Sequence, residues 1–136
     1  MRPSLNTVRR AAVLLFGAAG LALLPWTWWL SESLPRHHNT RHWDLAWGGF
    51  DSLLALGFLL TALAAWYRHP WLPAAAAATG AMLVCDAWFD IVLENRSNDF
   101  EVAVFEAVAA EIPAAIICFS VAYITSRAGP RALDRA

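Results

Sequence analysis

The chain has 136 residues, of which 59% are hydrophobic, a share well above the ~45–50% of ordinary soluble domains. Lysine is absent, so arginine supplies all ten basic residues, and the formal net charge is only −1. A net charge so close to zero gives no reason to expect a nucleic acid or another polyanion as a partner. A chain of this length is expected to form a single domain, which we take as residues 1–136.

Four segments are long and apolar enough to form helices that cross a bilayer, which takes about 20 mostly apolar residues. In chain order they are residues 11–30, 45–67, 71–93 and 102–125. The first contains no charged residue and the second contains Asp51. The third contains Asp86 and Asp90, and the fourth contains Glu106 and Glu111. Backbone polar groups in lipid must be satisfied within the segment, so these segments are helices. We therefore expect an all-α, polytopic membrane protein, an up-down bundle of four transmembrane helices embedded in the lipid bilayer.

The first segment follows Arg9 and Arg10, as the apolar part of a signal peptide also would. Its apolar run is longer than the ~7–15 residues of a signal sequence, and no small-x-small cleavage site follows Trp28 and Trp29. We therefore expect a retained helix.

Two further features concern the shape and packing of these helices. Pro25 and Pro113 each lack a backbone donor and are expected to bend the helix that contains them. The small residues at 74–78, followed by Gly80, are expected to let a neighbouring helix approach closely.

The arginines and the aromatic residues both indicate an orientation in the membrane. Seven arginines lie on the side of the termini and three on the other: Arg2, Arg9, Arg10, Arg68, Arg127, Arg131 and Arg135 against Arg36, Arg41 and Arg96. Because arginine-rich flanks stay in the cytoplasm, we expect a plasma-membrane protein with both termini inside. Two aromatic belts fit this orientation, an outer one of Trp26, Trp28, Trp29, Trp43 and Trp47 and an inner one of Trp66, Tyr67, Trp71 and Tyr123.

Five acidic residues fall within the predicted helices: Asp51, Asp86, Asp90, Glu106 and Glu111. At ~1.5 Å of rise per residue they occupy the outer half or the middle of the bilayer, with Glu111 the deepest. Asp86 and Asp90, four residues apart, share a helix face. Glu106 and Glu111, five apart, point about 140° from each other. Glu111 is therefore expected to turn away from the other acids, unless Pro113 distorts the helix.

These acids are costly, because a charged aspartate at the centre of a transmembrane helix costs ~2.5–3.5 kcal/mol. No basic residue lies within the four predicted segments. The acids are accommodated if they are protonated, if they line a water-filled crater open to the outside, or if they hold a cation such as Mg²⁺ or Ca²⁺. The plain structural alternative is a polar interior in which they bond to hydroxyl groups and water. Because intramembrane ionisable residues usually mark function, the candidate binding residues are Asp44, Asp51, Asp86, Asp90, Glu106 and Glu111, with Trp47 and Trp88.

A divalent metal is the one cofactor that the sequence suggests. His38 and His42 lie in the first outer loop, and with Asp86 and Asp90 they are candidate metal ligands. Short histidine-rich tracts are only a compositional signal, and we favour the plainer explanation of a solvated or interfacial loop. No HExxH, GxSxG, P-loop or CxxCH motif occurs, so no catalytic residue and no other cofactor is predicted.

The stretches WDLAWGGFD at 43–51 and DAWFD at 86–90 carry a resemblance. They look like small four-helix membrane proteins of high-GC actinobacteria, an uncharacterised group. The resemblance implies a four-helix membrane fold and a shared site at these tryptophans and aspartates. It implies no activity.

Three functions fit the pattern. The first is the binding or transport of a proton, a metal or an organic cation at outward-facing carboxylates. The second is a membrane enzyme that acts on a lipid or isoprenoid by carboxylic-acid catalysis, with Trp47, Trp88 and Phe89 stabilising a carbocation. The third is an accessory subunit of a larger membrane complex, and a homodimer is also open. We expect the first.

Overall fold

The structure is a computed structural model that describes residues 4–33, 43–93, 104–105 and 107–128. The described part is helical throughout apart from short turns. Its elements are α1 (Leu5–Ser33), α2 (Trp43–Trp66), α3 (Leu72–Leu93), the π-helical turn η1 (Ala107–Glu111) and α5 (Ile112–Ala128). The described residues form four helical stretches long and apolar enough to cross a membrane: Leu5–Trp29, Ala46–Trp66, Leu72–Val92 and Ala107–Ala128. The predicted all-α class and the four candidate spans are confirmed.

The first helix begins earlier than the prediction of residue 11. Ser4 stands at its N-terminus, where its side-chain oxygen accepts a hydrogen bond from the Thr7 backbone N–H at 3.2 Å, as an N-cap serine does. Arg9 and Arg10 therefore lie within α1. The expectation that the four helices contain no basic residue is wrong, because the prediction took these arginines as the helix boundary.

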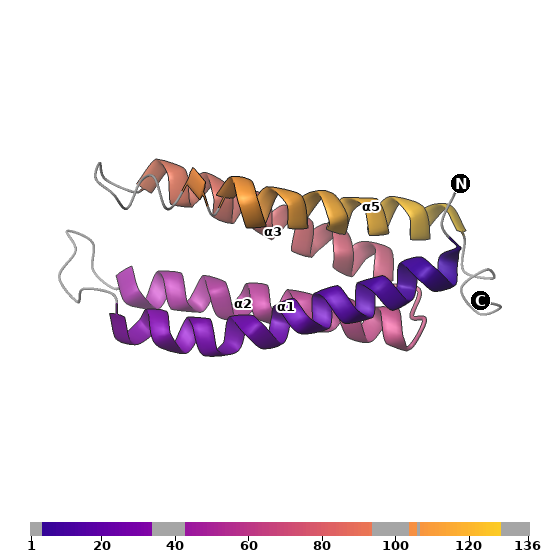
Figure 1. Cartoon of the computed structure of the whole chain (residues 1–136), viewed down its shortest axis with the longest axis horizontal. Coiled ribbons are helices and arrows are strands. Elements are labelled where there is room, and N and C mark those ends of the chain that lie inside the picture. The colour runs from indigo at the N-terminus through magenta and orange to yellow at the C-terminus, as the bar shows by residue number, and fades with distance from the viewer. Residues whose placement is uncertain (1–3, 34–42, 94–103, 106, 129–136) are drawn as a thin grey trace.

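Consecutive helices run in alternating directions, so the start of α1 and the end of α5 lie at the same end of the molecule (Figure 1). We call this the arginine end, because Arg9, Arg10, Arg68 and Arg127 are the arginines of the described residues and all lie there. The most extensive packing is within two pairs, α1 with α2 and α3 with α5. The two pairs meet through α2 with α3 and, less extensively, through α1 with α5.

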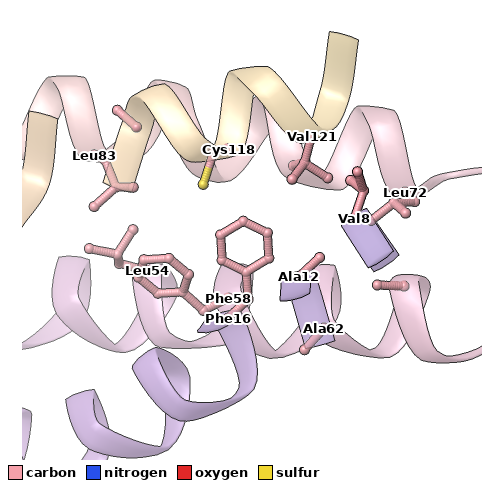
Figure 2. Packing of buried hydrophobic residues seen from close by; sticks show 13 residues of the cluster. Val8, Ala12, Phe16, Leu54, Phe58, Ala62, Leu72, Leu83, Cys118 and Val121 are labelled. Atoms are coloured by element: carbon pink, nitrogen blue, oxygen red, sulfur yellow. The ribbon is translucent and has the colours of Figure 1, made fainter. Parts of the chain in front are cut away.

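The core lies between these two pairs of helices. On α1, Val8, Ala12 and Phe16 recur every four residues, so they share one face, and all three are buried. The rings of Phe16 and Phe58 stack with their centroids 5.9 Å apart. Figure 2 shows the two rings between the α1–α2 pair and the α3–α5 pair, one directed toward Cys118 of α5 and the other toward Leu54.

Glycines stand where neighbouring helices come closest. A Cβ atom on Gly20 of α1 would lie 2.9 Å from Cγ of Leu59 on α2. A Cβ atom on Gly80 of α3 would lie 3.0 Å from Cβ of Cys118 on α5. Small residues at such contacts let helix backbones approach in a membrane, where van der Waals packing drives association. The predicted packing role of Gly80 is confirmed.

The fourth span is not a continuous α-helix, and Pro113 explains why. Pro113 is the second residue of α5 and cannot donate the backbone hydrogen bond that an α-helix would direct to residue 109. The turn before it, Ala107–Glu111, is π-helical, a form that often accommodates a local break in the α-helical ladder. The bend predicted at Pro113 therefore takes the form of a change in helix type.

The outward faces of the bundle are strongly apolar. Large side chains such as Leu14, at 72% exposed, Phe105, at 69%, and Ile116, at 60%, point away from the core. Exposed apolar surface on this scale is uncommon in a soluble monomer, and lipid is the solvent that would cover it.

Candidate functional site

The acids predicted to form a site are buried to different degrees. Asp51 on α2 and Asp86 on α3 are each only 7% exposed. Asp90 on α3 and Glu111 at the end of η1 are half-buried. The side chain of Asp44, and the predicted residues Glu106, His38 and His42, lie outside the described part of the structure, so their roles stay predictions.

A buried contact between two threonines fixes the register of α2 against α3. The side-chain oxygens of Thr61 and Thr79 are 3.1 Å apart. Because the two helices are antiparallel, Asp51, ten residues before Thr61, stands level with Phe89, ten residues after Thr79. Asp51 therefore lies at a height between Asp86 and Asp90 along the bundle.

The contact of Gly80 with Cys118 fixes α3 against α5 in the same way. Asp86, six residues after Gly80, stands level with Ile112, six residues before Cys118. Glu111 is thus about one residue's rise from the height of Asp86, rather than deeper than the aspartates. The 140° separation expected between Glu106 and Glu111 assumed a continuous α-helix. It does not apply, because Ala107–Glu111 is a π-helix.

Asp51, Asp86, Asp90 and Glu111 consequently lie within a layer about 6 Å thick, at ~1.5 Å per residue. We call this layer the carboxylate band. Trp66, an exposed residue at the arginine end, stands level with residue 74 of α3 by the same register. The band is therefore about 18–24 Å from Trp66 along the bundle. In a membrane whose hydrocarbon core begins at Trp66 and is about 30 Å thick, the band would lie in the half of the core farther from Trp66.

The hydroxyl groups near these helices mostly bond to backbone carbonyl groups. Ser52 donates to the Gly48 carbonyl oxygen at 2.6 Å, and Ser120 donates to that of Ile116 at 2.7 Å. Thr79 donates to the Ala75 carbonyl oxygen at 3.0 Å. Such bonds satisfy hydroxyl groups within a transmembrane helix.

The aromatic residues predicted to accompany the site are divided between the interior and the surface. Trp47 is half-buried. Trp88 is 65% exposed and Phe89 44% exposed, on the outside of the bundle. The roles predicted for Trp47, Trp88 and Phe89, including that of stabilising a carbocation, stay predictions.

No metal centre is formed by the described residues, since no three of their His, Cys, Asp and Glu side chains come close enough together to hold an ion. The proposed ligands His38 and His42 are not among them. The predicted metal site on Asp86 and Asp90 therefore stays a prediction.

A second feature was missed by the sequence analysis. Three arginines line a pocket at the arginine end together with three apolar side chains: Arg9, Arg10, Arg68, Val13, Leu14 and Trp66. In the sequence these arginines indicate only the orientation of the chain in the membrane. Nothing in their spacing shows that α1 and the turn after α2 bring them together.

No family model, curated protein or solved structure matches the chain. The resemblance to small actinobacterial membrane proteins, expected from 43–51 and 86–90, stays a prediction.

Proposed function

We propose that this chain is an integral protein of the plasma membrane that binds or transports a proton or a cation, metal or organic, at the carboxylate band. Its four helices would cross the bilayer with both termini in the cytoplasm. The band would then lie in the outer half of the membrane and be reached from outside.

The observation that carries this proposal is the burial of Asp51 and Asp86 within the carboxylate band. Each is only 7% exposed, and they come from two adjacent helices. A charged aspartate at the centre of a transmembrane helix costs ~2.5–3.5 kcal/mol. Ionisable groups kept in a membrane at such a cost commonly take part in the passage or binding of ions.

The distribution of charge supports the orientation. The described arginines lie at one end, and the four carboxylates of the band lie toward the other. Arginine-rich flanks face the cytoplasm. The exposed rings of Trp66, Tyr67 and Trp71 at the arginine end are the kind of interfacial anchor found at a membrane boundary.

The chemistry of the band suggests how a proton and a cation would be coupled. A cation at Asp51 or Asp86 would bind the ionised carboxylate and not the neutral acid. Cation binding would therefore release a proton, and low pH would weaken cation binding. A proton-coupled transporter requires an exchange of this kind between a proton and a cation at one site.

The proposal is tested by thermal unfolding of the purified protein in detergent. Mg²⁺ and tetramethylammonium are titrated separately at several pH values, for the wild type and for Asp51→Asn and Asp86→Asn. We expect at least one cation to raise the unfolding temperature, more strongly at high pH, and both variants to lose this response. Asp134→Asn, which removes the acid at 134 near the C-terminus, is the matched control and should keep it. A wild type that responds to neither cation nor pH would contradict the proposal, as would a full response in both variants.

A further inference from the structure

Three arginines that are far apart in the sequence line one pocket at the arginine end. Arg9 and Arg10 come from α1, and Arg68 comes from the turn between α2 and α3. The pocket has a volume of about 370 Å³, within the range of small-molecule sites. Its remaining lining is apolar and consists of Val13, Leu14 and Trp66.

The pocket concentrates positive charge without a described counter-charge. The four carboxylates whose side chains the structure describes belong to the carboxylate band, about 18–24 Å from Trp66 along the bundle. Asp134 lies outside the described residues. Arg9 and Arg68 are half-buried, so water screens their repulsion less than it would on an open surface. A bound anion would relieve that repulsion.

The backbone at Arg68 is a second, independent observation. The N–H of His69 donates to the Ala64 carbonyl oxygen at 2.8 Å, and the N–H of Arg68 donates to that of Ala65 at 3.4 Å. These two bonds form a Schellman motif that ends α2, and its left-handed position is usually glycine. Here that position is Arg68, with φ at 56°. The chain keeps an arginine here in a conformation that disfavours side chains, and such positions cluster at binding and functional sites.

We propose that this pocket binds the phosphate headgroup of an anionic phospholipid. The guanidinium groups of Arg9, Arg10 and Arg68 would hold the phosphate oxygens, for which the forked donor geometry of arginine is suited. Val13 and Leu14, one turn farther along α1 toward the bilayer centre, would contact the acyl chains. The apolar lining is what favours a lipid over free phosphate. The proposal requires the chain to lie in a membrane, and it does not depend on the carboxylate band.

Position along the bundle agrees with this assignment. Trp66 is the last residue of the candidate span Ala46–Trp66, so the pocket lies where the hydrocarbon core would meet the headgroups. Basic pockets at the cytoplasmic ends of transmembrane helices commonly bind anionic headgroups.

The test counts bound lipid by native mass spectrometry of the full chain, released from detergent that contains phosphatidylglycerol, phosphatidylcholine or inorganic phosphate. We expect phosphatidylglycerol to bind and to raise the unfolding temperature, with little effect of the other two additives. Arg9→Gln and Arg68→Gly should each weaken phosphatidylglycerol binding about tenfold, the effect of losing one charge-assisted contact.

Arg68→Gly separates a binding defect from a folding defect. Glycine suits the left-handed turn, so this variant should unfold at a higher temperature than the wild type in lipid-free detergent while binding lipid more weakly. Arg127→Gln is the matched control, because Arg127 lies at the same end but over the ring of Tyr123, 4.7 Å from its centroid, and not in the pocket. Unchanged binding by both pocket variants would overturn the proposal. So would equal weakening by Arg127→Gln, equal binding of phosphatidylcholine, or stabilisation by inorganic phosphate alone.

Discussion

Thr61 of α2 and Thr79 of α3 contact each other through their side-chain oxygens, 3.1 Å apart, with both side chains fully buried. Thr79 also donates to the Ala75 carbonyl oxygen, and a hydroxyl group has one hydrogen to donate. When Thr79 makes that bond to Ala75, Thr61 is the donor in the pair. The pair sets the register that brings Asp51 to a height between those of Asp86 and Asp90.

Replacing Thr79 by valine removes the acceptor of this bond and should destabilise the bundle modestly. Interhelical hydrogen bonds in membranes are worth about 0.6 kcal/mol on average, because the freed group finds other partners. Thr61 can turn back to a carbonyl of its own helix. A double-mutant cycle of Thr61→Val and Thr79→Val, followed by reversible unfolding in mixed micelles, should give a coupling energy of about 0.6 kcal/mol.

The control for the threonine pair is Ser120→Ala, since Ser120 is exposed and bonds only within α5 in the described contacts. Its effect on stability should be close to zero. Strictly additive effects of the two threonine variants would show that the pair does not hold α2 and α3 in register.

Gly80 should be far less tolerant of alanine than Gly49 is. A Cβ atom on Gly80 would lie 3.0 Å from Cβ of Cys118 and 3.2 Å from the Phe119 ring, whereas one on Gly49 meets nothing within 4 Å. Overpacking of a close helix contact typically costs about 1–3 kcal/mol. Alanine in place of an exposed helical glycine instead stabilises by about 0.5–1 kcal/mol. Unfolding of the two variants in the same detergent should therefore shift in opposite directions. Equal shifts would mean that α3 and α5 are not closely packed at Gly80.

Much of the helical framework could be predicted because the bilayer constrains it strongly. The predicted ranges 45–67 and 71–93 differ from α2 and α3 by two residues or fewer at either end. The ends flanked by arginine were less predictable. A long arginine side chain can extend from within a helix to the interface, so Arg9 and Arg10 did not mark the helix start that the prediction assigned to them.

The packing of one helix against another, and the relative heights of their residues, could not be predicted from the sequence. The 3.6-residue period places Asp86 and Asp90 on one face, but it does not say which neighbour that face meets or at what height. Those answers come from contacts such as Thr61 with Thr79 and Gly80 with Cys118. For the same reason the arginine pocket was not foreseen. The π-helical turn could have been suspected from Pro113, which the sequence analysis expected only to bend the helix.

Membrane orientation can be measured with reporter fusions at two points. Alkaline phosphatase folds only outside the cytoplasm, so a fusion after residue 136 should be inactive if the C-terminus is cytoplasmic, as the arginine bias predicts. A fusion after residue 96, between the third and fourth predicted helices, should be active. Green fluorescent protein at the same points should show the reverse pattern. An active phosphatase at the C-terminus would invert the orientation and place the carboxylate band on the cytoplasmic side.

Phe16 and Leu14 lie two residues apart on α1 and should respond very differently to alanine. Phe16 is 2% exposed and stacks on Phe58, whereas Leu14 is 72% exposed. When the unfolded helices also lie in lipid, truncating a core side chain changes the transfer free energy from water very little. The cost in stability is then mainly that of the cavity left behind. A cavity of roughly 100 Å³ then makes Phe16→Ala cost about 2 kcal/mol, less than the ~3–5 kcal/mol of a soluble core. Leu14→Ala should cost almost nothing in the same unfolding measurement, because lipid covers that side chain in both states. A cost for Leu14→Ala as large as that for Phe16→Ala would show instead that this face of α1 packs against another protein chain.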